Sequence, residues 1–281
     1  MKGIIVRNGY FCSKAYDEQI LRLTEEFQKA GVETDIYFNK FPVTTCQKFN
    51  YDFCVFLDKD INLAKVIEKS GVKIFNNPKA IYISDSKIRT SIALAELCDV
   101  KLQKAVFSPK KYFYETDKDF LLEASEILGY PMVIKDAYGS RGEQVFMVEN
   151  FSELCEIDKL MGTNEYLLEE YRHTSKGKSV RIIVVGGRVL GGMVLENENN
   201  FRSNSYLGGK GKVFNVPVEY ELVSQTVART LNLDYCGVDL FYDEPVVIEV
   251  NSNAYFAEFE ETTGINVALN YVQHILENVY D

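Results

Sequence analysis

The chain has 281 residues, 46% of them hydrophobic and 13% aromatic, which is enough apolar material for about two or three compact units. Its 31 basic and 41 acidic residues give a formal net charge of −10, which argues against general binding to nucleic acid or to anionic membranes. The sequence has six cysteines without a CxxC pair and only two histidines, which argues against a zinc site. The scattered cysteines, and the lack of a signal segment and of an apolar run long enough to cross a membrane, favour a cytoplasmic protein.

The first 84 residues alternate predicted strands with predicted helices whose apolar side chains recur at spacings of three and four. The expected elements are strands at 4–6, 35–38, 53–57 and 72–75 and helices at 16–30 and 61–69. This alternation predicts a small parallel α/β unit. Because the segment has no Gly-x-Gly-x-x-Gly sequence, we expect a scaffold or one half of a substrate cleft and not a dinucleotide site.

A boundary is expected at Asn76-Asn77-Pro78, followed by an α+β unit that extends to residue 170. The expected elements are helices at 85–98, 117–128 and 151–161, strands at 102–107 and 166–170, and a strand–loop–strand segment at 130–148. Lys87 falls in the first turn of the helix at 85–98, where the helix dipole does not favour a cation. This placement hints at an anionic partner, although a solvated lysine is the commoner case.

The loop Gly139-Ser140-Arg141-Gly142 follows a strand that ends at Lys135. One interpretation is an ordinary hairpin turn. The other is a flexible flap whose backbone amides and Ser140 contact phosphates, with Lys135 as a point charge. The residues of the loop leave both interpretations open.

Residues 171–281 are expected to form a last unit. The expected elements are strands at 180–185 and 188–195, a helix at 223–231, a hairpin of strands at 235–241 and 245–250, and a helix at 266–279. Between them, Phe201-Arg202-Ser203-Asn204 leads to the glycines and lysines of 208–212. That stretch is either a surface loop or a local basic patch suited to an anion.

The hairpin at 235–250 carries acids inside apolar runs. Asp239 lies in the first run, Glu249 lies in the second, and Asn251 closes it. These side chains offer hard oxygen ligands of the kind that Mg²⁺ takes alongside substrate phosphates. A hairpin whose acids point to solvent is the alternative, and these residues alone favour neither.

The order of these features resembles the ATP-grasp ligases, in particular the group of the ribosomal protein S6 glutamate ligase and the lysine-biosynthesis carrier-protein ligases. The motifs that carry the resemblance are Asp85-x-Lys87, Tyr130-Pro131-x-Val133-x-Lys135, Gly139-x-x-Gly142, Glu169-Glu170-Tyr171, Lys176-Gly177-x-x-x-Arg181, Phe201-Arg202-Ser203-Asn204, Gly208-Gly209, Gly237-Val238-Asp239, Glu249-Val250-Asn251 and Thr262-Thr263-Gly264-Ile265. The resemblance implies an ATP-grasp fold of α/β and α+β class. It would comprise an N-terminal α/β pre-domain at 1–84, a central ATP-lid subdomain at 85–170 and a C-terminal antiparallel-sheet subdomain at 171–281.

The resemblance also implies an ATP-dependent carboxylate–amine ligase. ATP would phosphorylate a carboxylate, and an amine would attack the acyl phosphate to give an amide or peptide bond, ADP and phosphate. The amine would be a glutamate-like amino acid, and the acceptor a peptide, a carrier protein or a metabolite. A free small-molecule or dipeptide ligase of the same fold and a non-catalytic nucleotide-binding module are the alternatives. Relatives of this kind commonly form homo-oligomers.

The resemblance assigns roles to individual residues. Arg202 would be the catalytic residue, facing the transferred phosphoryl group and the acyl oxygen. The residues implied to bind ATP are Lys87, Lys135, Gly139, Ser140, Gly142, Glu170, Tyr171, Arg202, Ser203 and Asn204. Mg²⁺, or Mn²⁺ in its place, would be held by Asp239, Glu249 and Asn251.

The chain departs from the family pattern at two places. Ser179 stands where the family often has an acidic residue, which leaves a ribose or adenine contact open there. Ser252 to Phe256 replace a Pro-Gly turn of many relatives, so we expect a differently shaped loop on the substrate side.

Overall fold

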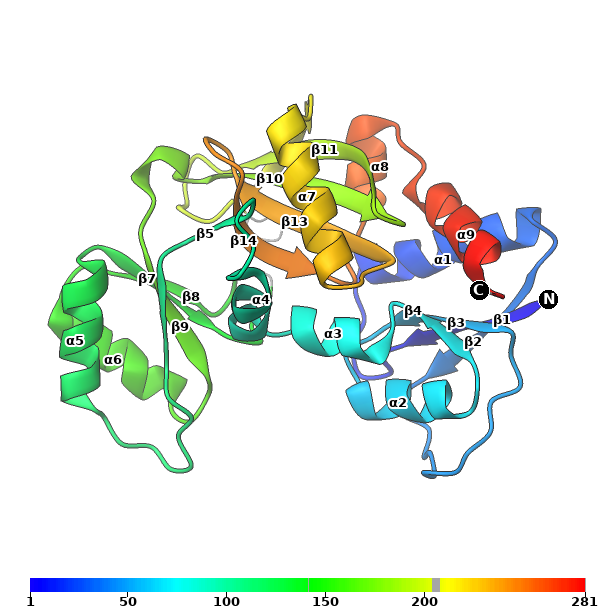
Figure 1. Ribbon diagram of the computed structural model, residues 1–281, viewed down its shortest axis with the longest axis horizontal. Coiled ribbons are helices and arrows are strands. Elements are labelled where there is room, and N and C mark those ends of the chain that lie inside the picture. Colours follow the sequence, from blue (N-terminus) through cyan, green and yellow to red (C-terminus); the bar gives the residue numbers. More distant parts are fainter. Residues whose placement is uncertain (141, 204–207, 281) are drawn as a thin grey trace.

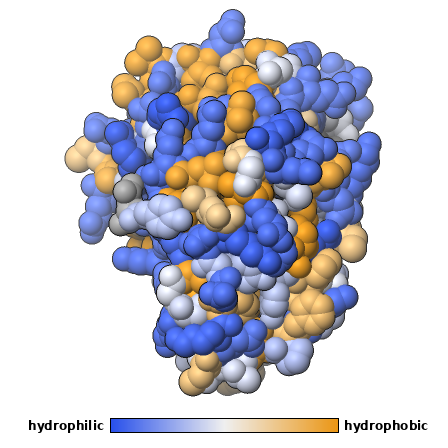
Figure 2. All heavy atoms as spheres, turned by 90° about the vertical axis from the view of Figure 1, so that its right-hand side faces the viewer, coloured by the Kyte–Doolittle hydropathy of each residue, from blue (hydrophilic) through white to orange (hydrophobic). Residues whose placement is uncertain are grey.

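The computed structural model describes residues 1–140, 142–203 and 208–280. The described residues form three sheets, which Figure 1 shows as a parallel sheet near the N-terminus, an antiparallel sheet at the opposite end, and a larger sheet between and above them. No helix in this part of the chain combines the length and the apolar character that a membrane span needs. The face near the chain termini mixes hydrophilic and hydrophobic side chains (Figure 2), as protein surfaces ordinarily do.

The N-terminal sheet has the strand order β2-β1-β3-β4, and all its pairs are parallel. Its elements are β1 (Lys2–Arg7), α1 (Lys14–Lys29), β2 (Glu33–Phe38), β3 (Phe53–Leu57), α2 (Ile61–Lys69) and β4 (Lys73–Phe75). Every residue of β3 is buried, as expected of a strand covered on both faces. The predicted parallel α/β unit is confirmed.

The sheet at the opposite end has the order β6-β9-β7-β8, and its pairs are antiparallel. Its strands and the two helices packed on it are β6 (Ala105–Phe107), α5 (Lys118–Leu128), β7 (Met132–Asp136), β8 (Val145–Val148), α6 (Phe151–Met161) and β9 (Tyr166–Glu170). The apolar side of α5 buries Leu121 and Ala124 against strand residues such as Met132. This core fixes β7 and β9 within their own sheet.

The middle sheet has the order β12-β11-β10-β13-β14-β5. Its elements are β5 (Lys101–Leu102), β10 (Lys178–Val185), β11 (Arg188–Glu196), β12 (Lys210–Phe214), α7 (Val218–Thr230), β13 (Tyr235–Phe241), β14 (Val246–Asn251), α8 (Ala257–Thr263) and α9 (Val267–Asn278). Alternate residues of β10 enter two different cores. Ile182 and Val184 pack in the core that includes α7, whereas Ile183 and Val185 pack in the core shared with α1 and α9.

The helix predicted at 85–98 is wrong in its extent. Residues 78–94 form two helices, α3 (Pro78–Ser84) and α4 (Lys87–Leu94). Each begins at its own N-cap, because the side chain of Asn77 accepts from Ala80 N and that of Ser86 accepts from Arg89 N. Lys87 is therefore the first residue of a helix, as expected for the first turn.

The strand predicted at 102–107 is also wrong, because the chain changes sheets within it. β5 pairs with β14 in the middle sheet, whereas β6 pairs with β9 in the outer antiparallel sheet. Helix α7 starts at Val218, ahead of the predicted 223, directly after Pro217. Strand β12 and helix α8 were not predicted: β12 occupies the stretch interpreted as a loop or basic patch, and it gains its backbone partners from β11.

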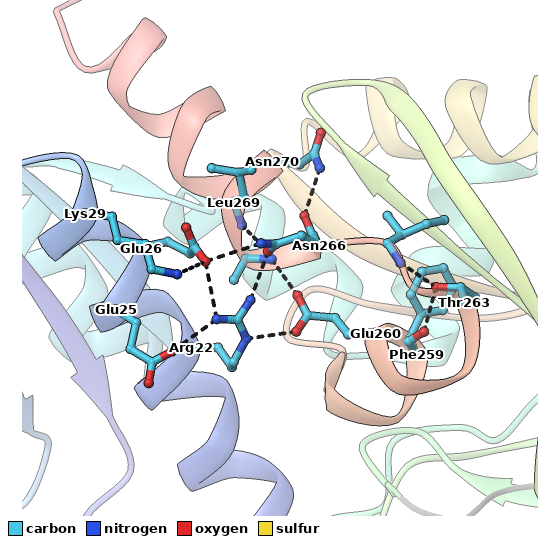
Figure 3. Close-up of polar contacts among 12 residues, drawn as sticks. Arg22, Glu25, Glu26, Lys29, Phe259, Glu260, Thr263, Asn266, Leu269 and Asn270 are labelled. Atoms are coloured by element: carbon cyan, nitrogen blue, oxygen red, sulfur yellow. Dashed lines mark hydrogen bonds and ion pairs between the residues drawn. The ribbon is translucent and has the colours of Figure 1, made fainter.

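Arg22 joins α1 to the two C-terminal helices (Figure 3). Its guanidinium donates to Glu260 at 3.0 Å, to Glu26 at 3.3 Å and to the Asn266 side-chain oxygen at 3.0 Å. Asn266 is the N-cap of α9, and Glu260 accepts from the backbone of Ala268. One cation thus ties the N-terminal unit to helices that pack on the middle sheet.

Glu26 is the buried anion of this network, with only 4% of its side chain exposed. The Lys29 ammonium, 2.9 Å away, holds the pKa of Glu26 below its ordinary value; burial opposes this shift, and Asn266 and Arg22 support it. A carboxylate with a lowered folded-state pKa adds stability above its unfolded pKa, and that contribution is lost as pH falls through the folded value.

We expect Arg22→Ala to lower the free energy of unfolding at pH 7 by about 2 kcal/mol, because three carboxylates, those of Glu25, Glu26 and Glu260, lose a charged hydrogen-bond donor at a partly buried site. Urea denaturation measures the change. Lys14→Ala on the same helix is the control: its ammonium is 90% exposed, so we expect a change within about 0.5 kcal/mol. Equal losses in the two variants, or a loss from Arg22→Ala that persists well below pH 4.5, would contradict the assignment.

Candidate nucleotide and metal site

A cleft between the outer antiparallel sheet and the middle sheet gathers most of the predicted site residues. Those that line it are Lys87, Lys135, Gly139, Gly142, Glu170, Tyr171, Arg202, Ser203, Asp239 and Glu249. Ser140 and Asn251 line an adjoining cleft, and Asn204 lies outside the described residues. Motifs that are far apart in the chain therefore meet at one place, although their individual roles stay predictions.

Strand register places the three predicted metal ligands on one face of the middle sheet. Asp239 of β13 pairs with Glu249 of β14, and two residues further along Asn251 pairs with Gly237. Arg181 of β10 pairs with Asp239 from the other side. Because paired residues and residues two apart share a face of a sheet, these four side chains converge.

Asp239 is 7% exposed, and its charge is balanced by Arg181. The guanidinium donates from Nε and Nη2 to the two carboxylate oxygens at 2.8 and 2.7 Å, a forked geometry that fixes the carboxylate plane. Asn251 Nδ2 donates to Asp239 Oδ2 at 3.4 Å, so the amide of Asn251 lies beside the same carboxylate.

Glu249 is partly buried, and cations surround it. Burial acts to raise the pKa of Glu249, but the charges of Lys87, Arg181, Lys59 and Lys135 outweigh it and lower the pKa below its ordinary value. The side chain is therefore a carboxylate at neutral pH, the form that binds a cation.

The donor set fits Mg²⁺. Two carboxylates and one amide oxygen on a shared face are hard ligands, and phosphate oxygens commonly complete such a coordination sphere. Within the described residues, no cluster of three or more His, Cys, Asp and Glu side chains has metal-binding geometry. The set thus depends on Asn251 as its third protein donor.

Two lysines project into the cleft from different elements. Lys135 at the end of β7 is 8% exposed and forms an ion pair with Glu169 at 2.5 Å. Lys87, the first residue of α4, donates from Nζ to the carbonyl of Gly139 at 2.5 Å. The Lys87 ammonium therefore lies beside Gly139, that of Lys135 lies beside Glu169, and both side chains line the cleft.

The loop between β7 and β8 is bound by side chains from outside its own hairpin. Arg202 Nη1 donates to the carbonyl of Gly142 at 2.5 Å and to that of Val145 at 3.3 Å. Gly142 has a φ of 74°, a left-handed conformation that glycine adopts without strain. These contacts exceed what a simple turn needs, since they link the loop to the segment after β11.

The inner end of the cleft has apolar and aromatic walls, of which the sequence assigned a role to Tyr171 alone. The residues concerned are Val133, Phe201, Phe241 and Ile248, together with Tyr171, whose ring meets that of Phe201 edge-on at 6.2 Å. Strand residues of this kind resemble ordinary core residues, so no sequence signal distinguishes them. Such walls suit a flat heterocycle.

Ser179 lines the cleft, and the turn at 243–245 is bound by residues that include the lining residues Arg172 and Ser175. Ser179 Oγ lies 2.5 Å from Ser203 Oγ, so a hydrogen bond between hydroxyls occupies the position where relatives often carry an acid. Burial acts to raise the pKa of Asp243, but hydrogen bonds from Ser175, Thr174 and Arg172 outweigh burial and lower the pKa to about 2. This anchors the β13–β14 turn to the segment after β9.

A second cleft lies between the N-terminal unit and the middle sheet. Its lining shares Lys87, Gly139 and Glu249 with the first cleft, so the two clefts meet at these residues. Its N-terminal wall includes Asn8 and Asp58, which sequence reasoning missed because they belong to no motif. Their position directly after β1 and β3 was the available signal.

The segment 252–256 joins the middle sheet to the N-terminal unit. Asn253 Nδ2 donates to the carbonyl of Leu57 at 2.8 Å, and Asn253 Oδ1 accepts from Gln19 at 3.0 Å. The carbonyl of Ser252 accepts from Asn76 at 2.9 Å. The departure from the family pattern thus builds one wall of the second cleft.

We expect Arg202→Met to loosen the 139–145 loop in the free protein. Loss of a charge-assisted bond to two carbonyls should raise amide exchange there by roughly tenfold. Hydrogen exchange with mass spectrometry measures it, with the exposed Arg188→Met as the control that should leave the loop unchanged. Unchanged exchange in Arg202→Met would show that Arg202 does not hold the loop.

A model of a protein family, described as the RimK-like ATP-grasp domain, matches residues 84–275. The uncharacterized protein MG012 homolog of Mycoplasma pneumoniae is 28% identical over 266 residues, and the match covers 90% of this chain and 91% of that relative. Beta-citrylglutamate synthase B of Danio rerio is 33% identical over 220 residues, covering 75% of this chain but 52% of its own. The chain therefore spans about half the length of that synthase.

A crystal structure of D-alanine–D-alanine ligase from Bacillus anthracis complexed with ATP has the same fold. Its TM-score is 0.74 at 18% identity, over 99% of this chain and 97% of that chain. At this identity the likeness shows the fold alone. The predicted ATP-grasp fold class is confirmed.

Proposed function

This chain belongs to the RimK-like ATP-grasp family and is an ATP-grasp ligase, and we propose that it joins a carboxylate to an amine through an acyl phosphate. The observation that carries the proposal is the meeting of two clefts at Lys87, Gly139 and Glu249. A nucleotide in the first cleft would present its terminal phosphate where the second cleft opens. A carboxylate in the second cleft would then lie within reach of that phosphate.

In this proposal the first cleft binds ATP. The apolar walls and the backbone of Glu170 and Tyr171 receive the adenine, while Lys87 and Lys135 bind the phosphates. The 139–142 loop, with Ser140, covers them and excludes water, which protects an acyl phosphate from hydrolysis. Mg²⁺, or Mn²⁺ in its place, would be held by Asp239, Glu249 and Asn251 and would neutralise phosphate charge.

Two displacements complete the reaction. The substrate carboxylate oxygen attacks the terminal phosphorus, and the bond from phosphorus to ADP breaks. The amine nitrogen then attacks the acyl carbon, the carbon–oxygen bond to phosphate breaks, and a proton leaves the nitrogen. Arg202, with Ser203 and Asn204 beside it, stabilises the charge on the transferred group, since a forked cation suits phosphoryl and acyl oxygens.

The substrates proposed are a glutamate-like amino acid as the amine and a peptide, carrier protein or metabolite as the carboxylate. The name of the Danio rerio relative supports a glutamate-like amine. A free small-molecule or dipeptide ligase and a non-catalytic nucleotide-binding module are the alternatives. We also propose a cytoplasmic location, a homo-oligomer, and the division into parts at 1–84, 85–170 and 171–281.

The proposal predicts ADP release that requires both substrates. Purified protein with Mg²⁺ and ATP is assayed against pairs of carboxylates and amines, starting with citrate and L-glutamate, and the product is identified by mass spectrometry. We expect one ADP per amide bond. ATP binding without ADP release for every pair would favour the non-catalytic module.

Glu249→Gln should lower turnover by about 10³-fold or more, because the neutral amide removes a charge that a bound cation needs at the reacting phosphate. The exposed Glu277→Gln on α9 is the matched control and should keep wild-type turnover. Thermal melting confirms folding of both variants. Full activity of Glu249→Gln would remove the metal assignment.

A further inference from the structure

Asp58 is a buried carboxylate on the wall of the second cleft, with 9% of its surface exposed. It accepts hydrogen bonds from Asn8 Nδ2 at 3.1 and 3.3 Å and from the backbone N–H of Lys59 at 2.7 Å. The Lys59 ammonium itself pairs with Asp85, 2.5 Å away. Within the described part of the chain, Asp58 thus has hydrogen-bond donors but no ion pair.

Asp58 lies at the point where the strand order of the N-terminal sheet reverses, between β1 and β3. β1 is flanked by β2 on one side and β3 on the other, so the chain leaves the carboxyl ends of β1 and β3 toward opposite sides. Asn8 follows β1 and Asp58 follows β3 directly. In open parallel sheets the crevice between two such ends is where ligands bind.

The crevice is held in place by contacts that reach the middle sheet. Tyr16 OH donates to the carbonyl of Leu57 at 2.6 Å and accepts from the backbone N–H of Asn8 at 2.9 Å. The same Leu57 carbonyl accepts from Asn253 at 2.8 Å. Asn253 follows Asn251 by two residues, so Asp58 has a fixed position relative to the predicted metal ligands.

A carboxylate buried without a counter-charge is costly, and a bound cation offsets that cost. Burial raises the pKa of Asp58, an effect that the hydrogen bonds from Asn8 and Lys59 reduce, so the carboxylate gains from a cationic partner. Mg²⁺ is assigned to the first cleft, so the remaining cationic reactant of a carboxylate–amine ligase is the protonated amine, which releases one proton to solvent before its nitrogen attacks the acyl phosphate.

We propose that Asp58, positioned by Asn8, binds the amino group of the amine substrate in this crevice. The inference rests on the proposed ligase function and assigns the amine to the N-terminal side of the second cleft. The substrate carboxylate then occupies the side near Lys87, where the two clefts meet. Asp58 acts as a specificity-determining residue for an amine that arrives as a cation.

The test compares two amines of different charge with Asp58→Asn. L-Glutamate, or the amino acid that wild type uses best, brings an ammonium group, whereas hydroxylamine is uncharged at pH 7.5 and traps an acyl phosphate as a hydroxamate. Loss of a charged hydrogen bond should raise KM for the amino acid by about tenfold to a hundredfold. Hydroxamate formation and the affinity for the ATP analogue AMP-PNP should stay within about twofold of wild type, which also shows that the variant folds.

Two further variants complete the design. Asp58→Glu keeps the charge and should recover part of the amino-acid affinity. Asp60→Asn is the matched control, because Asp60 is the N-cap of α2, asparagine caps equally well, and the residue does not line the cleft. An unchanged KM in Asp58→Asn, or a parallel loss of amide and hydroxamate formation, would overturn the amine site alone. A wild type that forms neither ADP nor hydroxamate with any carboxylate would overturn the ligase function and the amine site together.

Discussion

The forked ion pair between Arg181 and Asp239 is the interaction on which the candidate site depends. Two guanidinium nitrogens of Arg181 lie 2.8 and 2.7 Å from the two carboxylate oxygens of Asp239. This pairing allows a carboxylate to be buried on a strand of the middle sheet, where an unpaired charge would be prohibitively costly. With Asp239 compensated in this way, Glu249 on the neighbouring strand remains available as a second anion. Lys87 at the start of α4 and Lys135 on β7 of the outer sheet then balance Glu249. The charges of the site are therefore distributed over two sheets, and the site exists only when these sheets face each other.

Much of the fold followed from local patterns. Apolar spacing predicted α1 and the parallel strands, and the order of motifs predicted which distant residues would meet. What failed depended on tertiary contacts. Only Gln103 and Lys104 separate β5 from β6, too little polar sequence to reveal a change of sheet. β12 is rich in glycine and lysine, and it is a strand because β11 offers it a partner.

The proposed binding residues also fall into two groups, those that local sequence motifs predicted and those that only the tertiary structure revealed. Lys135 and Glu249 stood in recognisable motifs, whereas Asn8 and Asp58 became visible only when the order of the parallel strands was known. A strand order cannot be read from periodicity, because it is set by how the crossover helices pack. The cleft proposed for ATP could thus be predicted from the sequence in outline. The cleft proposed for the second substrate required the structure, and it is there that the chain departs from the pattern of its relatives.

Asn253 has a further consequence, for motion. Its bond to the Leu57 carbonyl and the Arg22 network fasten the N-terminal unit to the middle sheet at two separate places, so these parts behave as one body. The outer antiparallel sheet is linked to the middle sheet at the cleft, where Arg202 donates to the carbonyl of Val145 on β8; the chain enters this sheet between β5 and β6 and leaves it after β9. Opening of the nucleotide cleft would therefore be a rotation of that sheet about these two crossings. In such a motion the side of the second cleft formed by Asn8 and Asp58 would keep its shape, whereas the side formed by Tyr138, Gly139 and Ser140 would move with the sheet.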